Sequence, residues 1–326
     1  MKKLWYALPM LALSLWACEA DRSTTKEGDL VPLTVEEDPN LPYIMVNGTQ
    51  LHAETFGNPA HPMLVFLHGG PGGDYLNGMQ VKALANDGYY VIFYDQRGSG
   101  LSKRHDKDTY SIQLMIDDLT AVIEHYRTSA DQRVFLFGHS WGAMLTAAYL
   151  NAYPNRIDGA IFAEAGGFNK ELLDEYGAAS RNFKLLTEVA NDIFYMDQFV
   201  TGGENDHAVL DYKLSLITPF AYHKDNDEGV EGPSPFNRFG AVTLNSLSDI
   251  AENEGFDFTP NLDQYTIKVL FLYGELNRSY GLEFAQREAA FFPNADIVQI
   301  DDTGHEMIYF QWEQVHPVVL DYLNSL

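Results

Sequence analysis

Two kinds of residue are scarce in this chain, and each scarcity excludes a class of protein. Cysteine occurs once among 326 residues, so no disulfide can form within the chain. Lysine and arginine number 21 against 46 aspartates and glutamates, which gives a formal net charge of −25 at pH 7. Because a chain this acidic repels phosphate backbones, we do not expect it to bind nucleic acid. The length and the hydrophobic content of 46% suffice for one large domain, or for one domain with an insertion.

The first 40 residues have the composition of an export signal followed by a tether. Two lysines precede an apolar run that ends at Trp16 and is too short to span a bilayer comfortably. The single cysteine, Cys18, follows this run in a way that resembles the lipobox of bacterial lipoproteins. The resemblance implies a signal peptide over 1–17, an acylated Cys18, and export to a membrane of the bacterial cell envelope. Residues 18–40 then form a polar tether. Cleavage without acylation is the alternative, and it would leave a free thiol in an oxidising compartment.

Apolar runs and helical patterns alternate along most of the remaining chain. The apolar runs have no polar face, which is typical of strands in a mostly parallel sheet covered on both faces. They lie at 63–68, 89–95, 133–138, 157–166, 267–274 and 295–300. The helical patterns between them include an amphipathic stretch at 111–127. This order predicts a doubly wound α/β fold with helices on both faces of the sheet.

The alternation is interrupted once. Residues 167–262 read as mainly helical, and they contain seventeen acidic residues against six basic ones. An insertion of this kind is placed to form a helical lid over the carboxyl ends of the strands. We therefore expect a core made of 41–166 and 263–326, with a cap over 167–262.

The motif GHSWG at 138–142 lies between an apolar run and a helical pattern. G-x-S-x-G in that context is typical of a nucleophile elbow, in which a strained turn exposes the serine at a helix N-terminus. Ser140 is therefore the candidate nucleophile. The alternative is an ordinary helix N-cap at Ser140.

Two further motifs indicate the remaining machinery for acyl transfer. HGGPGG (68–73) follows the strand at 63–68, and its backbone N–H groups are suited to an oxyanion hole. Pro71 has no N–H, so we choose Gly70, with Gly69 as the alternative, together with Trp141. His305, in TGHEM after the last strand, is the candidate base, and a solvated loop histidine is the alternative.

HGGPGG, DQRGSG (95–100) and the S-W-G of the elbow resemble the prolyl iminopeptidase branch of the α/β-hydrolase superfamily. The resemblance covers roughly 43–166 and 265–326, and it departs at His139, where the branch usually has glycine. It implies an α/β-hydrolase fold, no metal and no organic cofactor. It also implies cleavage beside an N-terminal proline, with acids of the lid holding the free amine. We expect the aspartate and arginine of DQRGSG to form a structural pair.

The triad acid is the open question. In the family it usually lies three residues after the glycine that ends the penultimate strand, and here that residue is Asn277. Glu164, at the end of the strand after the elbow helix, is our first choice, and Glu275 is the alternative. Some haloalkane dehalogenases are similar in this acid placement. A chain with no acid at all is the third interpretation.

These interpretations predict a serine hydrolase that acts on a small peptide, amide or ester, with N-terminal-proline peptides as one substrate class. An esterase or lipase, and a catalytically retired binding protein, are the alternatives. The expected partners are a small-molecule or short-peptide substrate and, through the lipid anchor, a membrane. The sequence does not indicate an oligomeric state.

Overall fold

The structure is a computed structural model that describes residues 30–180, 207–221, 229, 231–232 and 234–326. The expected signal peptide and Cys18 lie outside the described residues. Within them, no helix is long and apolar enough to cross a membrane.

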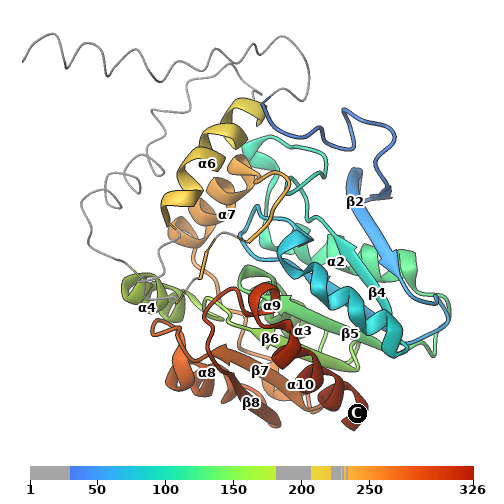
Figure 1. Ribbon diagram of the computed structural model, residues 1–326, viewed down its shortest axis with the longest axis vertical. Coiled ribbons are helices and arrows are strands. Elements are labelled where there is room, and N and C mark those ends of the chain that lie inside the picture. The colour runs from blue at the N-terminus through green and yellow to red at the C-terminus, as the bar shows by residue number, and fades with distance from the viewer. Residues whose placement is uncertain (1–29, 181–206, 222–228, 230, 233) are drawn as a thin grey trace, which may run out of the picture.

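Eight strands of the described chain form one sheet in the order β1-β2-β4-β3-β5-β6-β7-β8 (Figure 1). They are β1 (Tyr43–Val46), β2 (Thr49–Phe56), β3 (Met63–Leu67), β4 (Tyr90–Tyr94), β5 (Val134–His139), β6 (Gly159–Ala163), β7 (Val269–Gly274) and β8 (Ala295–Ile300). β1 and β4 both pair with β2 in antiparallel fashion, and all the other pairs are parallel. The predicted α/β fold is confirmed.

The strand β3 shows why the central strands are apolar throughout. Met63, Val65 and Leu67 belong to the core on one face of the sheet, where α2 (Ile112–Tyr126), α3 (Trp141–Ala152) and α8 (Gly281–Ala289) pack. Leu64 and Phe66 belong to the core on the other face, with the 3-10 helix η1 (Tyr75–Asp87), α9 (Met307–Phe310) and α10 (Trp312–Ser325). Both faces are covered, so each residue of such a strand is buried.

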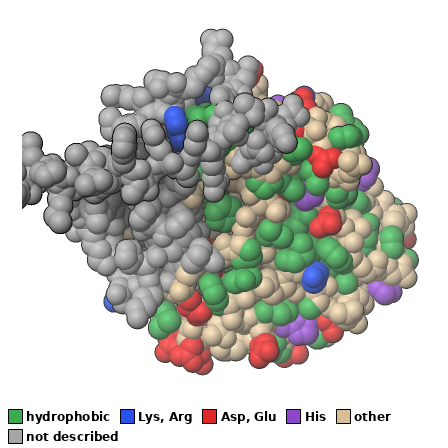
Figure 2. Space-filling model, turned by 45° about the horizontal axis from the view of Figure 1, so that its top comes forward, with side chains coloured by type: hydrophobic (Ala, Val, Ile, Leu, Met, Phe, Trp, Pro, Cys, Tyr) green, Lys and Arg blue, Asp and Glu red, His purple; other side chains and the backbone are tan. Residues whose placement is uncertain are grey.

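The insertion lies between β6 and β7. Its described elements are α4 (Lys170–Ser180), α6 (His207–Ala221) and α7 (Ala241–Asn253), followed by the 3-10 turn η4 (Leu262–Gln264). α6 and α7 lie side by side (Figure 1). Another 3-10 turn, η2 (Lys107–Thr109), precedes α2. Among the described surface residues that Figure 2 shows, acidic side chains are more prominent than basic ones.

Residues 31–35 dock on the fold, although the composition places them in the tether. Residues 30–40 were expected to be tether, but Val31, Thr34 and Val35 are buried. The Val35 N–H donates to the Leu101 carbonyl at 2.8 Å. Three buried side chains are too few to produce a periodic apolar pattern, so no pattern in the sequence indicated this contact.

Candidate active site

Ser140 occupies a strained turn between β5 and α3. Its φ of +54° and ψ of −121° lie outside the regions that residues with a Cβ normally adopt. A Cβ on Gly138 would lie 2.4 Å from the Gly142 carbonyl oxygen, and a Cβ on Gly142 would lie 2.0 Å from the Leu67 carbonyl oxygen. Both positions therefore require glycine. The Ser140 N–H donates to the Ala163 carbonyl at 2.9 Å, which holds the turn against the end of β6.

Glu164 follows β6 directly, is fully buried, and meets His305. The distance from its Oε2 to His305 Nδ1 is 3.1 Å. The Gly274 N–H donates to Oε1 at 2.6 Å, and the Asn277 side-chain amide donates to Oε2 at 2.6 Å. Three donors, from the end of β7, the loop after it and the loop after β8, thus converge on one carboxylate, which is the condition under which a buried charge is tolerated.

Asn277 supports Glu164. Its side chain is buried, and its Oδ1 accepts the backbone N–H groups of Ser279 and Tyr280, at 3.0 Å each. Its Nδ2 is therefore directed at Glu164. Nothing in the sequence pattern pointed to this bond beyond the placement of an amide where the family usually has the acid. Glu275, the alternative acid, is exposed, and its Oε2 accepts the Asp302 N–H at 3.0 Å.

His139 brings the His305 loop next to the elbow. Its Nε2 donates to the His305 backbone carbonyl at 2.7 Å, and the two rings lie 4.8 Å apart. Burial, aided by the neighbouring His305, lowers the pKa of His139 and keeps its ring neutral. His139 therefore serves as a hydrogen-bonding residue between the elbow and the His305 loop.

The glycine loop after β3 runs against Ser140. A Cβ on Gly69 would lie 3.0 Å from the Ser140 Cβ. Gly70 has a φ of +125°, and a Cβ there would lie 2.6 Å from the Gly73 nitrogen. Neither the Gly70 N–H nor the Trp141 N–H donates a hydrogen bond within the described part of the chain. Both donors remain available to a ligand.

The expected pair between Asp95 and Arg97 is wrong, because each residue has a partner from another element. The Asp95 carboxylate lies 2.8 Å from His52 Nδ1 on β2. Arg97 donates to both carboxylate oxygens of Asp118 on α2, at 2.7 and 2.8 Å. The expected structural role stands, but the partners come from distant parts of the sequence.

The loop after β3 also holds the insertion. The Asp74 carboxylate accepts the backbone N–H groups of Asn237 and Arg238, and the Gly240 N–H donates to the Gly72 carbonyl at 2.7 Å. Burial, together with the nearby Asp95 charge, raises the pKa of Asp74 to about 7. Hydrogen bonds therefore join the candidate oxyanion loop to the insertion.

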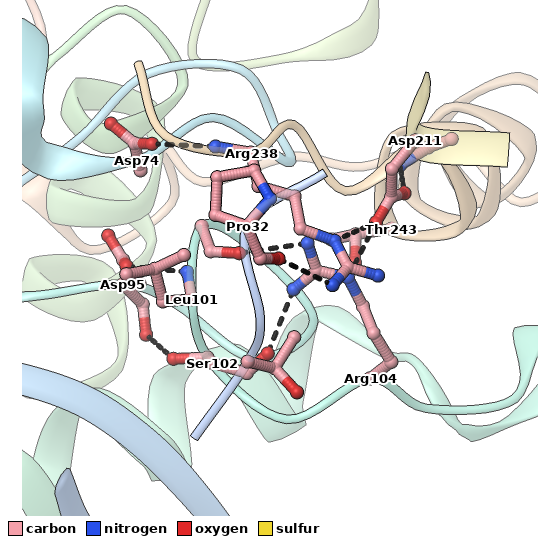
Figure 3. Close-up of polar contacts among 12 residues, drawn as sticks. Pro32, Asp74, Asp95, Leu101, Ser102, Arg104, Asp211, Arg238 and Thr243 are labelled. Carbon is pink, nitrogen blue, oxygen red and sulfur yellow. Dashed lines mark hydrogen bonds and ion pairs between the residues drawn. The ribbon is translucent and has the colours of Figure 1, made fainter. Parts of the chain in front are cut away.

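A buried charge cluster joins three parts of the chain (Figure 3). Asp211 on α6 accepts Arg104 Nε from the core at 3.0 Å and Arg238 Nε from the insertion at 2.7 Å. Arg238 also donates to the Pro32 carbonyl at 2.9 Å, which ties in the N-terminal segment. All three charged side chains are buried, so this cluster fixes α6 over the core.

No group of three or more His, Cys, Asp or Glu side chains is placed to hold a metal ion in the described ranges.

Comparisons with known proteins agree with this architecture. The model of the alpha/beta hydrolase fold family matches residues 62–311. A proline iminopeptidase from Thermoplasma volcanium is 35% identical over 285 residues, which are 80% of this chain and 88% of that protein. Among solved structures, the proline iminopeptidase of Mycobacterium smegmatis has a TM-score of 0.61 at 19% identity, covering 88% of this chain and 98% of that one. The enol-lactonase from Burkholderia xenovorans LB400 has a TM-score of 0.60 at 17% identity, covering 87% and 100%.

The family match covers well over half of the chain, and the Thermoplasma relative is 35% identical over 80% of it. The chain therefore belongs to the α/β-hydrolase fold family, in its prolyl iminopeptidase-like branch, and is a hydrolase of that family.

Proposed function

We propose that this protein is a serine hydrolase with Ser140 as nucleophile, His305 as base and Glu164 as acid. The observation that carries the proposal is the 3.1 Å contact between His305 Nδ1 and the buried Glu164 carboxylate. Glu164 follows β6, the neighbour of the strand that carries Ser140. A carboxylate at Nδ1 fixes the ring so that Nε2 can act on the serine hydroxyl.

The chemistry proceeds in two balanced halves. His305 takes the proton of the Ser140 hydroxyl as Oγ bonds to the substrate carbonyl carbon. The resulting oxyanion accepts hydrogen bonds from the backbone N–H groups of Gly70 and Trp141. Collapse breaks the bond to the leaving amine or alcohol, which takes the proton from His305. Water then attacks the acyl-enzyme by the same route and releases the acid.

For the substrate we propose short peptides or amides with an N-terminal proline. The support is the Thermoplasma relative, which is named a proline iminopeptidase, and the acidic composition of the insertion, which suits capture of a protonated amine.

Two measurements test the proposal. A fluorophosphonate probe should label the wild type and spare Ser140→Ala, with both proteins folded. Absence of labelling in the folded wild type would indicate a binding protein on a retired hydrolase fold. A paired assay of a proline arylamide against a short-chain nitrophenyl ester then decides the substrate, and higher kcat/KM for the ester would assign an esterase.

We also propose that the protein is exported and anchored through an acylated Cys18, outside the described residues. The support is the short apolar run before this single cysteine. Expression in a bacterium fed radioactive palmitate should label the wild type and not Cys18→Ala. Equal membrane recovery of both would contradict the anchor.

A further inference from the structure

Gln96, the residue after the aspartate of DQRGSG, hydrogen-bonds both to the loop after β3 and to the first residue of α3. It is buried at 1% exposure. Its backbone N–H donates to His68 Nε2 at 2.9 Å, and its side-chain Nε2 donates to the His68 carbonyl at 3.0 Å. Its Oε1 accepts the indole N–H of Trp141 at 2.8 Å.

Two bonds from Gln96 hold the loop that carries one oxyanion donor: its backbone N–H holds the His68 ring, and its side-chain amide holds the His68 carbonyl. Because Nε2 accepts from Gln96, the neutral ring carries its proton on Nδ1, which donates to the Gly69 carbonyl at 2.8 Å. Burial lowers the pKa of His68, which keeps this ring neutral. The Gly69 carbonyl belongs to the peptide unit whose N–H is that of Gly70. Since a peptide unit is planar, holding its carbonyl sets the direction of its N–H.

The bond to Trp141 leads to the other donor. Trp141 is the first residue of α3, so its backbone N–H has no partner within the helix. Its indole is buried and held by Gln96. One side chain therefore connects the residue that carries one donor with the loop that carries the other.

We propose that Gln96 is a positioning residue that fixes the Gly70 and Trp141 N–H groups relative to each other as one oxyanion hole. The inference rests on the proposed serine hydrolase. Oxyanion donors act on charge that develops in the transition state, so misplacing them lowers kcat more than it changes KM. Removal of one such donor outright costs about 10²–10³-fold in kcat. We expect a smaller loss, about 10- to 100-fold, when the donors are present but not held.

The test replaces Gln96 with Met, which keeps the length of the side chain and removes its two side-chain hydrogen bonds, to the His68 carbonyl and from the Trp141 indole. The backbone N–H bond to the His68 ring stays in place in this variant. The matched control is Gln132→Met, because Gln132 is also buried and spends its amide on loop groups. Gln132 donates to the carbonyls of Pro59 and His61 and accepts the Thr128 N–H. It lies just before the start of β5, whereas the candidate site lies after the end of β5, so the control is at the opposite end of the sheet. Both variants should lower the melting temperature. Only Gln96→Met should lower kcat, with KM within about threefold and an unchanged pH profile, because His305 and Glu164 are untouched.

Trp141→Phe removes the same indole bond and leaves the backbone N–H, so it tests the inference even where Gln96→Met fails to fold. Its kcat should fall in the same direction, and the double variant should lose less than the product of the two single losses. Inhibition by a boronic acid, which mimics the tetrahedral intermediate, should weaken in parallel with kcat/KM. If folded Gln96→Met or Trp141→Phe keeps the kcat of the Gln132→Met control, the inference is overturned while the proposed function stands. A folded wild type that neither reacts with fluorophosphonate nor turns over ester or amide overturns the proposed function itself.

Discussion

Replacing Glu164 with glutamine tests the candidate triad at its least conventional position. Glutamine has one acceptor oxygen and one amide donor, whereas three donors converge on the native carboxylate. One donor must therefore face another donor, which costs about 1–3 kcal/mol of stability. The larger effect is on the reaction, because the imidazolium of His305 loses its countercharge. In a serine protease the corresponding change lowers kcat about 10⁴-fold, equivalent to about 5.5 kcal/mol in the barrier.

We therefore expect Glu164→Gln to lower kcat by about 10³–10⁴-fold while the protein remains folded. The assay is ester or arylamide turnover, with circular dichroism to confirm folding. Glu275→Gln is the control, because it is an exposed glutamate close in sequence to Asn277, and it should keep nearly full activity. A folded Glu164→Gln with kcat within about tenfold of the wild type would refute the reasoning, and a larger loss in Glu275→Gln would transfer the role to that residue.

The same geometry predicts a rescue. Asn277 Nδ2 lies 2.6 Å from Glu164 Oε2, so Asn277→Asp places a carboxylate beside the lost one while its second oxygen keeps the Ser279 and Tyr280 bonds. Glu164→Gln/Asn277→Asp should recover at least tenfold in kcat over Glu164→Gln. In the wild-type background, Asn277→Asp puts two carboxylates in contact, so one pKa of the pair rises and the acid limb of the pH profile moves to higher pH. No recovery in the double variant would show that position 277 cannot serve His305.

Three further predictions concern stability. Asp211→Ala leaves two buried arginines without their shared carboxylate, so it should lower the free energy of unfolding by about 3–5 kcal/mol in denaturant titration. The control Asp249→Ala breaks an exposed ion pair and should cost at most about 1 kcal/mol. Equal losses would contradict a stabilising role for the buried charge cluster. Gly142→Ala should prevent folding of the elbow, seen as lost fluorophosphonate labelling with a lowered melting temperature, because its Cβ would lie 2.0 Å from a backbone oxygen; a fully labelled variant would contradict it. The pKa of Asp74 is about 7 in the folded state against an ordinary value of 3.8, so the folded state binds this proton more tightly than the unfolded state. The free energy of unfolding therefore decreases as pH rises from about 4 to 7. This decrease should be smaller in Asp74→Asn, and an unchanged decrease would show that other groups cause it.

The parts of the site that could be predicted from the sequence are those set by local backbone rules. The elbow is predictable from the glycines on either side of Ser140 and the continuous apolar run before it. A side chain at either glycine would collide with backbone atoms of the turn itself or of the neighbouring strand. The partners of Arg97 and Gln96 could not be predicted in this way. They lie on α2, in the loop after β3 and at the start of α3, and only the folded sheet brings these elements together. Residues 30–40 escaped prediction for a related reason, since their contacts are few and carry no period.

The position of the candidate acid, Glu164, follows from the geometry of parallel strands. β6 and β7 are neighbours, so the residues that follow them emerge at the same rim of the sheet, and β8, which leads to His305, lies beside β7. A carboxylate from either rim position can therefore reach the same imidazole nitrogen. Once Glu164 fills that place, a second carboxylate after β7 would repel it at hydrogen-bond distance, whereas an amide donates to it. An amide donor at 277, 2.6 Å from Glu164, therefore suits a buried carboxylate at 164, and the two residues form one arrangement.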